Sequence, residues 1–244
     1  MKNSKDYCVK IKKLFQTLKK NGAAVTPVSY DTPVDAIVYA FISAFTTEAN
    51  AGRILKRIGT HFVDLNDLRV SRPEEITEVF GDMSESATAS AQAMTRVLNA
   101  IFDKYDKVTL SGLTDDGKRQ ARKNLEEIPG MTPFTVAYTF LTALDGHAIP
   151  LTEKMVDYLK QNELVHPEST LQEIESFLER QIIAADAYTF YVLLRAEAEG
   201  GVKPAAKTAA PKASAKPAIQ KAAPKSAAKK EIKKTTVKKK TPKK

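Results

Sequence analysis

The segment LEEIPGMTPFTVA (residues 125–137) decides which fold the sequence predicts. Pro129 and Gly130 interrupt an amphipathic helix, and Gly130 can adopt the left-handed conformation that ends a helix at little conformational cost. Thr132 is a suitable N-cap for a second helix, and Pro133 fits the first helical position, where a missing N–H is no loss. The segment therefore predicts two helices joined by a tight turn.

A turn of this kind can bind a phosphate group. Its backbone N–H groups lack partners within the helix and lie at the positive end of a helix dipole, which attracts an anion. An ordinary corner between two helices of an all-α core accounts for the same residues, so the turn alone does not decide between these interpretations. The residues that would contact phosphate are Gly130, Met131, Thr132 and Thr135.

The charge of the 244-residue chain is unevenly distributed. Residues 201–244 contain 15 lysines and one acidic residue, Glu231, which gives this segment a net charge of +14. Subtracting +14 from the whole-chain charge of +9 leaves residues 1–200 at −5. Five prolines and dense like charge prevent the C-terminal segment from forming a packed core. We expect residues 201–244 to be a disordered Lys/Ala/Pro-rich tail.

The composition excludes several classes of protein. The single cysteine, Cys8, rules out a disulfide within the chain and a Cys-ligated zinc or iron–sulfur site, and it is most simply a small apolar residue. His61, His147 and His166 are too scattered to indicate a metal site, and we expect no cofactor. The N-terminus lacks a secretory apolar core, and no apolar run is long enough to span a membrane. We expect a soluble intracellular protein of the cytoplasm or nucleoid.

Residues 1–200 predict an all-α body. Apolar residues recur at helical spacing, and no convincing period-two alternation predicts a strand. Residues 31–33 open a helix that is apolar on nearly every side, which places it at the centre of a bundle. Residues 169–172 resemble a capping box before another helix. The helix that residues 31–33 open is expected over 34–45, and the other helices are expected over residues 5–20, 49–62, 64–69, 72–80, 85–104, 115–127, 133–144, 151–162 and 185–198.

Three blocks of the sequence resemble the helix-hairpin-helix DNA glycosylases of the endonuclease III type. IPGMTPFTVA (128–137) resembles the family's LPGVGxKTA, ISAFTTE (42–48) resembles LSAQTTD after a PFE-like PVD (33–35), and PLTE (150–153) weakly resembles VDTH. The resemblance covers roughly residues 32–195. It implies a two-lobed helical bundle, with central helices over about 32–145 and a second lobe formed by about 1–30 together with 150–199.

The chain departs from the family at the positions that carry its chemistry. Phe134 stands where members that cut the sugar–phosphate chain have a lysine nucleophile, and a phenyl ring supplies no amine. Leu151 replaces the aspartate that activates water or stabilises the cationic sugar. Phe45 replaces the glutamine that fills the hole left by an extruded base, and Thr132 replaces the second hairpin glycine. No iron–sulfur cysteines follow Tyr191. The resemblance therefore implies a glycosylase scaffold that has lost catalysis.

Several residues allow two interpretations. Glu153 is the nearest remaining acid to the missing aspartate, but a first-turn carboxylate that interacts with the helix dipole is the simpler interpretation. Phe45 is either a wedge that stacks on a base or a core residue at the end of a buried helix. Lys118, Arg122 and Lys123 either flank a bound phosphate or form a solvated face that nearby carboxylates dilute.

The tail gives the strongest chemical signal, although an unspecific one. It resembles the tails of linker histones and of bacterial nucleoid proteins. If about eight lysines neutralised phosphates, the binding constant would fall with salt at a log–log slope of roughly −7, with no readout of sequence. A solubilising extension is the alternative, and RNA or an acidic protein is another possible polyanion. The tail residues expected to contact DNA are Lys229, Lys230, Lys233, Lys234, Lys238, Lys239 and Lys240.

The sequence thus predicts a non-catalytic protein that binds duplex DNA, mostly without sequence specificity. The turn would hold backbone phosphates, and the tail would supply non-specific affinity. One alternative is an active base-excision glycosylase that uses a non-standard carboxylate such as Glu153. A second alternative is an accessory subunit that binds another protein and is tethered to nucleic acid.

Overall fold

The computed structural model describes residues 4–114 and 117–200, so the predicted tail and its lysines lie outside the described residues. The described residues form eleven α-helices and one 3₁₀ helix and contain no strand, which confirms the predicted all-α class. The elements are α1 (Ser4–Asn21), α2 (Pro33–Phe45), α3 (Glu48–His61), α4 (Leu65–Val70), α5 (Pro73–Phe80), α6 (Glu85–Tyr105), η1 (Ser111–Thr114), α7 (Lys118–Glu126), α8 (Pro133–Ala143), α9 (Glu153–Gln161), α10 (Leu171–Gln181) and α11 (Ala184–Ala198).

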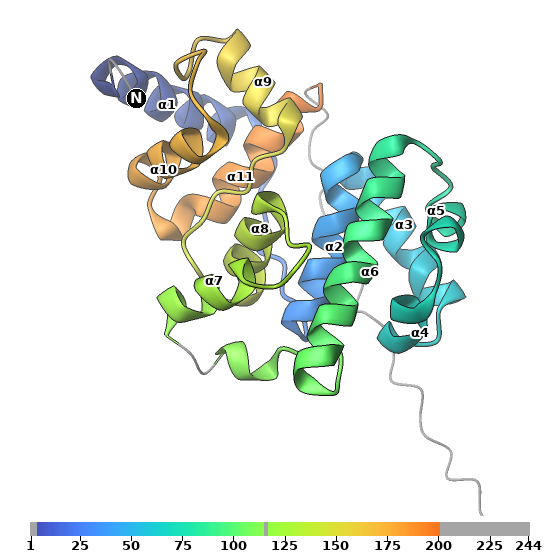
Figure 1. Ribbon diagram of the computed structural model, residues 1–244. Coiled ribbons are helices and arrows are strands. Elements are labelled where there is room, and N and C mark those ends of the chain that lie inside the picture. The colour runs from blue at the N-terminus through green and yellow to red at the C-terminus, as the bar shows by residue number, and fades with distance from the viewer. Residues whose placement is uncertain (1–3, 115–116, 201–244) are drawn as a thin grey trace, which may run out of the picture.

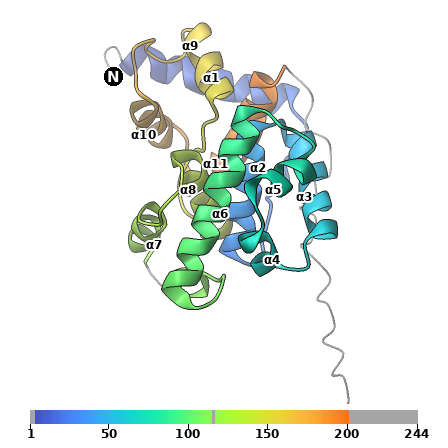
Figure 2. The same ribbon diagram turned by 45° about the vertical axis from the view of Figure 1, so that its right-hand side comes forward.

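The helices fall into two groups that meet at α8 and α11 (Figure 1). In the first group, α2 packs against α6, α3 and α8, while α4 and α5 cover α6 and α7 packs on α8. In the second group, α1 and α9 pack against α11, and α10 packs against α1. Figure 2 shows the same division from a second direction, with α1 and α9 at the top and α10 above α7 and α8.

The core is built around the two most apolar helices, α2 and α8. Ten of the thirteen residues of α2 are buried, and so are nine of the eleven residues of α8. This agrees with the prediction that the helix beginning near residue 33 lies at the centre of the bundle. Each large apolar side chain that becomes fully buried contributes about 1.5–3 kcal/mol relative to an exposed one. The packing of α2 against α8 therefore supplies most of the apolar burial that supports α8 and the turn at its N-terminal end.

Local capping explains where several helices begin. Thr32 caps α2, and Asp35 accepts a hydrogen bond from the Thr32 amide at 3.2 Å, so both halves of a capping box are present. The capping box predicted for residues 169–172 is wrong by one residue. Thr170 is the N-cap of α10, and Glu173 accepts from its amide at 2.9 Å. Ser169 is instead buried, and its amide donates to the His166 carbonyl at 3.0 Å.

Two helices begin later than the sequence predicts. The helix expected from residue 115 begins at Lys118, after η1, and its N-cap is Gly117. The helix expected from residue 151 begins at Glu153, because the Thr152 hydroxyl accepts the Met155 amide at 3.4 Å and so caps it. Leu151 consequently lies before α9.

Candidate nucleic-acid interface

The predicted turn between α7 and α8 is present and reaches the surface. Pro129 and Pro133 are exposed, and Gly130, Met131 and Thr132 are half-buried. Gly130 has φ +99°, the left-handed conformation that the sequence predicted for it. The expected position at the helix end is wrong, because α7 ends at Glu126 with Glu127 as its C-cap, and Gly130 lies further along in the turn. The turn is therefore accessible from solvent at its tip, while α8 continues directly into the core.

The turn rests closely against α6. A Cβ built at Gly130 would lie 3.2 Å from Cδ of Arg96, 3.2 Å from Cγ2 of Val97 and 3.3 Å from the carbonyl oxygen of Ala93. These distances are tighter than ordinary van der Waals contact, so the position needs glycine for space as well as for its backbone conformation. The stem of Arg96 thus passes beside the turn.

Hydrogen bonds within the turn decide which groups remain for a ligand. The Thr132 hydroxyl accepts from the Thr135 amide at 3.1 Å, and the two hydroxyl oxygens lie 2.8 Å apart. Thr135 is fully buried, so it supports the turn from inside. The Met131 amide donates to the Ile128 carbonyl at 3.2 Å. Gly130 and Thr132 are the residues whose backbone amides we consider for an external phosphate.

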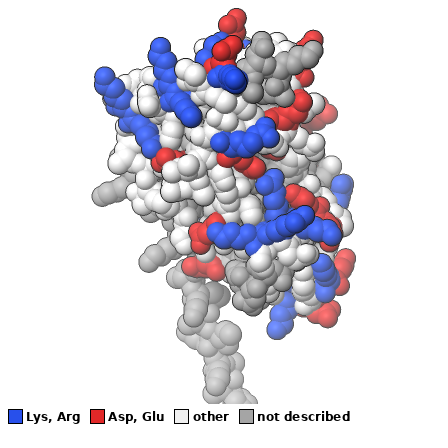
Figure 3. All heavy atoms as spheres, turned by 90° about the vertical axis from the view of Figure 1, so that its left-hand side faces the viewer, with Lys and Arg blue, Asp and Glu red and all other residues white. Residues whose placement is uncertain are grey.

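Three of the four cations of α7 have partners, and the fourth, Arg119, is exposed. Lys118 donates to the main-chain carbonyl of Asp145. Arg122 pairs with Glu126 at 3.1 Å and with Glu179 of α10 at 3.3 Å. On the face shown in Figure 3, basic and acidic side chains lie next to one another. Lys123 forms an exposed pair with Glu127 at 3.7 Å. The predicted basic residues beside the turn are therefore largely paired with acceptors.

Arg96 is a cation at the turn that the sequence analysis missed. It is exposed on α6 and forms no ion pair with any described residue. It comes about thirty residues before the turn, and only the packing of Gly130 against α6 brings the two together. Nothing in the spacing of charged residues along the chain could have indicated this pairing.

The two positions that carry chemistry in the resembling family are apolar and buried here. Phe134 is 7% exposed and stacks on Tyr138, with ring centroids 6.0 Å apart and an interplanar angle of 27°. Leu151 is 3% exposed. The Tyr138 hydroxyl lies 2.7 Å from that of Tyr30, which packs against the core from the segment before α2. Aromatic and aliphatic side chains therefore fill the space next to α8.

Phe45 and Glu153, the two ambiguous residues, have clear surroundings. Phe45 is half-buried at the end of α2 and stacks on Phe80, with centroids 5.2 Å apart and planes inclined by 26°. This contact supports the core-packing interpretation over the wedge. Glu153 is exposed at the first position of α9, behind the cap Thr152. This is where a carboxylate interacts favourably with the helix dipole.

A buried arginine behind the α2–α3 turn was also missed. Arg195 of α11 is 2% exposed, and its guanidinium donates to the carbonyls of Ser43 and Thr46 at 2.6 and 2.9 Å. It also donates to the Tyr191 hydroxyl at 2.6 Å. Arg195 therefore donates to carbonyls at the C-terminal end of α2, where the carbonyl groups find no N–H donor within the helix.

Two carboxylates pair with Arg195. Glu199 accepts from it at 2.8 Å, and Glu48 of α3 lies 3.3 Å from it. Glu48 also accepts a hydrogen bond from the Tyr39 hydroxyl. Burial and the neighbouring Glu48 charge raise the pKa of Tyr39, so its hydroxyl stays protonated as a donor. The sequence gives one signal of this network. Tyr191, Arg195 and Glu199 follow one another at intervals of four residues, which places them on the same side of a helix.

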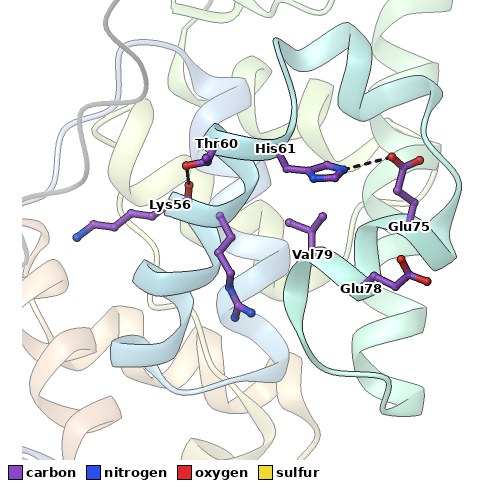
Figure 4. A pocket seen from close by; sticks show the side chains of 7 residues that line it. Lys56, Thr60, His61, Glu75, Glu78 and Val79 are labelled. Carbon is purple, nitrogen blue, oxygen red and sulfur yellow. Dashed lines mark hydrogen bonds and ion pairs between the residues drawn. The ribbon is translucent and has the colours of Figure 1, made fainter.

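A surface hollow of about 550 Å³ lies away from the turn, between α3 and α5 (Figure 4). The His61 ring points toward Glu75, with Nε2 3.3 Å from the carboxylate, and Lys56 points away from both. Arg57 donates to the Phe80 carbonyl at 2.6 Å. Cations and carboxylates are mixed here, so the hollow favours no anionic ligand.

Residues 4–114 and 117–200 contain neither a metal-binding cluster nor a membrane-spanning helix. In these ranges no group of three or more His, Cys, Asp or Glu side chains is arranged to hold a metal ion. None of the helices there has the length and apolar character needed to cross a membrane.

Comparison with known proteins gives matches at the level of structure. No protein-family model and no curated protein matches the sequence. A Clostridium acetobutylicum 8-oxoguanine glycosylase/lyase in complex with dsDNA containing cytosine opposite to 8-oxoG matches with TM-score 0.61 and 11% identity, over 82% of this chain and 72% of that chain. A non-covalent endonuclease III–DNA complex matches with TM-score 0.58 and 16% identity, over 80% and 86%.

A thermostable thymine-DNA glycosylase matches with TM-score 0.57 and 12% identity, over 83% of this chain and 90% of that chain. All three likenesses extend over most of the described helices, although the identities are low. The helical pair around the turn and these three structural likenesses together show that the chain has the fold of the helix-hairpin-helix DNA glycosylases.

Proposed function

We propose that this chain is a DNA-binding protein that uses a glycosylase-like body without glycosylase chemistry. The turn at residues 128–132 holds phosphates of one strand, and the lysine-rich tail supplies non-specific affinity. Duplex DNA is the partner that this function implies. The proposal concerns what the site does, whereas the structural likenesses concern its fold alone.

One observation carries the proposal: the turn is exposed at its tip, while the two positions expected to carry chemistry are inside the core. The Thr132 amide belongs to the N-cap of α8 and the Gly130 amide lies two residues earlier in the turn, at the end of the helix where the dipole favours an anion. Arg96 adds an unpaired cation beside Gly130. Phe134 and Leu151 offer neither an amine nor a carboxylate to a sugar.

The charges of the chain support a division of labour between body and tail. Residues 1–200 carry −5 and residues 201–244 carry +14, so a duplex is attracted mainly by the tail. The turn makes few contacts and therefore contributes position more than affinity. Deleting residues 202–244 is expected to weaken duplex binding at low salt by at least about 10²-fold, because several phosphate contacts are lost together. Unchanged affinity would refute this division.

The role of the turn is tested by a single substitution with a matched control. Arg96→Gln is expected to lower the magnitude of the log–log salt slope of duplex binding by about 1, which is the effect of one phosphate contact. Arg53→Gln on α3 removes an exposed arginine that forms no ion pair with a described residue. It should leave the slope unchanged. Equal effects of the two substitutions would mean that the turn is not the contact site.

The main rival is an active glycosylase that uses Glu153 or another acid. Incubation with duplexes that carry uracil, oxidised bases or alkylated bases separates the two functions. We expect no base release from any of them. Release that disappears in Glu153→Gln would establish the enzyme in place of the proposed function. The second rival is an accessory subunit that binds another protein. If that were its function, a partner protein would remain bound in a pull-down after nuclease treatment.

A further inference from the structure

The N-terminal helix differs in charge from the rest of the body. α1 contains six lysines and one acid, Asp6, which gives it a net charge of +5. Residues 22–200 contain 16 Lys and Arg against 27 Asp and Glu, which gives a net charge of −11. A basic helix therefore lies on an acidic body, and the excess of lysine is local to one element.

Four of the six lysines share the solvent side of α1 and form no ion pair with a described residue. The other two are paired: Lys10 lies 3.8 Å from Glu163, and Lys19 lies 2.8 Å from Asp186. The opposite side of the helix is buried against the second group of helices. We call the four unpaired residues the lysine face. They are Lys5, Lys12, Lys13 and Lys20.

The lysine face is a continuous stripe. At 3.6 residues per turn its members fall within about 100° of the helix circumference, and they extend over about 22 Å of its length. The cations of α7 have a different setting, because Arg122 and Lys123 are each compensated by carboxylates. The lysine face therefore groups four cations that form no ion pair with a described residue, and Asp6 is the one acid on the same helix.

We propose that the lysine face is a second phosphate-contact surface for duplex DNA, separate from the turn and the tail. This inference rests on the proposed function, since it assumes the same partner. In Figures 1 and 2, α1 lies at the top of the molecule, and α7 and the turn lie below it. Contacts at both places would orient a duplex relative to the two groups of helices, which a tail alone cannot do.

The chemistry of the lysine face fits nucleic acid better than an acidic protein. Protein–protein interfaces are depleted of lysine at their centres and rely on buried aromatic or arginine anchors. The lysine face has one exposed large apolar residue, Val9, and no aromatic anchor. Duplex DNA presents one charge per about 1.7 Å of its axis, so flexible lysines meet phosphates in any register.

The first test measures the salt dependence of duplex binding by the full-length chain. The lysine face is neutralised by the combined substitutions Lys5→Gln, Lys12→Gln, Lys13→Gln and Lys20→Gln. The magnitude of the log–log slope is expected to fall by about 2 to 4. The control removes the same charge from exposed lysines elsewhere on the body, through Lys56→Gln, Lys104→Gln, Lys107→Gln and Lys154→Gln. A slope that changes equally in both variants would overturn the inference.

The second test reports proximity without relying on affinity. In a Cys8→Ser background, a fluorophore is attached at Val9→Cys, in the middle of the lysine face, or at Val70→Cys on α4. The native side chains are 67% and 66% exposed, so the two labels begin with matched accessibility. Adding duplex DNA should reduce quenching by a neutral collisional quencher at position 9 and not at position 70. Equal protection, or none at position 9, would contradict the proposal.

The outcomes separate this inference from the proposed function. A wild-type chain that binds no duplex overturns both. A wild-type chain that binds duplex, with an unaffected slope in the lysine-face variant and an unprotected label at position 9, overturns the inference alone. Protection of that label by polyglutamate and not by duplex would assign the surface to an acidic protein and would also overturn it.

Discussion

Two arginines join the two groups of helices, and their electrostatic surroundings differ. Arg195 is 2% exposed, and acceptors from α2, α3 and α11 surround its guanidinium. Arg122 has a side chain that is 34% exposed, and it connects α7 to Glu179 of α10 at 3.3 Å. At the first junction the guanidinium is buried and pairs with Glu48 and Glu199. The second junction is open to water on one side.

The second junction also contains an unbalanced acid. Glu175 of α10 is 8% exposed, and its Oε1 has no hydrogen-bond partner within the described part of the chain. Burial and the negative charge of Glu179 raise the pKa of Glu175 to about 7, although Arg122 opposes the rise. The difference between the junctions is that both carboxylates beside Arg195 are ion-paired with it, whereas the buried Glu175 near Arg122 forms no ion pair with a described residue. A buried charge without such a partner is destabilising.

The largest effect is expected for Arg195→Met. The substitution removes the donors to two main-chain carbonyls and leaves the Glu48 and Glu199 carboxylates without a cation. Breaking a buried pair in this way costs about 3–5 kcal/mol, because the remaining charge stays desolvated. Urea unfolding followed by circular dichroism measures the loss. A loss below about 1 kcal/mol would show that the network around Arg195 relaxes easily, and the contrast with Arg122 would disappear.

The next effect is a pH dependence centred on Glu175. Because its pKa is raised in the folded state, the folded protein holds this proton more tightly than the unfolded chain. Stability should therefore fall as pH rises from the ordinary value of 4.5 to about 7, and the loss should be complete above that. Glu175→Gln should raise the free energy of unfolding at pH 8 by about 1 to 2 kcal/mol and leave it nearly unchanged at pH 4.

Thermal unfolding of the wild type and Glu175→Gln across this pH range makes the comparison. Glu168→Gln is a suitable control, because Glu168 is an exposed acid in the segment before α10. Parallel curves for wild type and Glu175→Gln would mean that Glu175 is ionised in the folded protein throughout the range.

A smaller effect is expected for Arg122→Gln. A partly exposed pair contributes about 0–1 kcal/mol, so the loss at pH 5 should be small. Removing the cation that lowers the pKa of Glu175 should, however, raise that pKa further and make the fall in stability between pH 5 and 8 steeper. Unfolding at several pH values detects both changes. A loss of stability as large as that of Arg195→Met would mean that Arg122 and Arg195 stabilise the two junctions equally, which would contradict the comparison.

The smallest effect is expected for Lys123→Gln. Lys123 and Glu127 lie 3.7 Å apart, and both side chains are more than half exposed. Such a pair contributes about 0.3 kcal/mol or less, and salt screens it. Urea unfolding at low and high salt should barely distinguish this variant from the wild type. A clear loss at high salt would mean that packing of the lysine stem, and not its charge, is what matters.

Local chemistry explains which parts of the fold could be predicted. The Thr32–Asp35 cap and the left-handed Gly130 follow from residue types within a few positions, and both are present. The capping box before α10 was misplaced because Ser169 and Thr170 are both acceptable caps. Only the burial of Ser169 selects Thr170. The positions of the turn and of these caps were thus predictable to within a residue or two.

The partners of charged residues could not be predicted in the same way. Lys118 and Arg122 were expected at a phosphate, but the fold brings acceptors to both from residues 27 and 57 positions away. Arg96 was overlooked, although packing places it against Gly130. Phe45 was left open between two roles, and its stacking partner Phe80 lies in another helix. Each of these depends on contacts that are distant in sequence.

The sequence by itself determined the all-α class, the turn between α7 and α8, and the charge contrast between residues 1–200 and 201–244. Hydrophobic period, capping and net charge are properties of neighbouring residues, so they can be read without coordinates. The tertiary structure alone decided which cations are free. Lys5, Lys12, Lys13 and Lys20 of α1 and Arg96 form no ion pair with a described residue, whereas Arg122 and Arg195 do, because packing determines where the opposite charges and carbonyl groups lie.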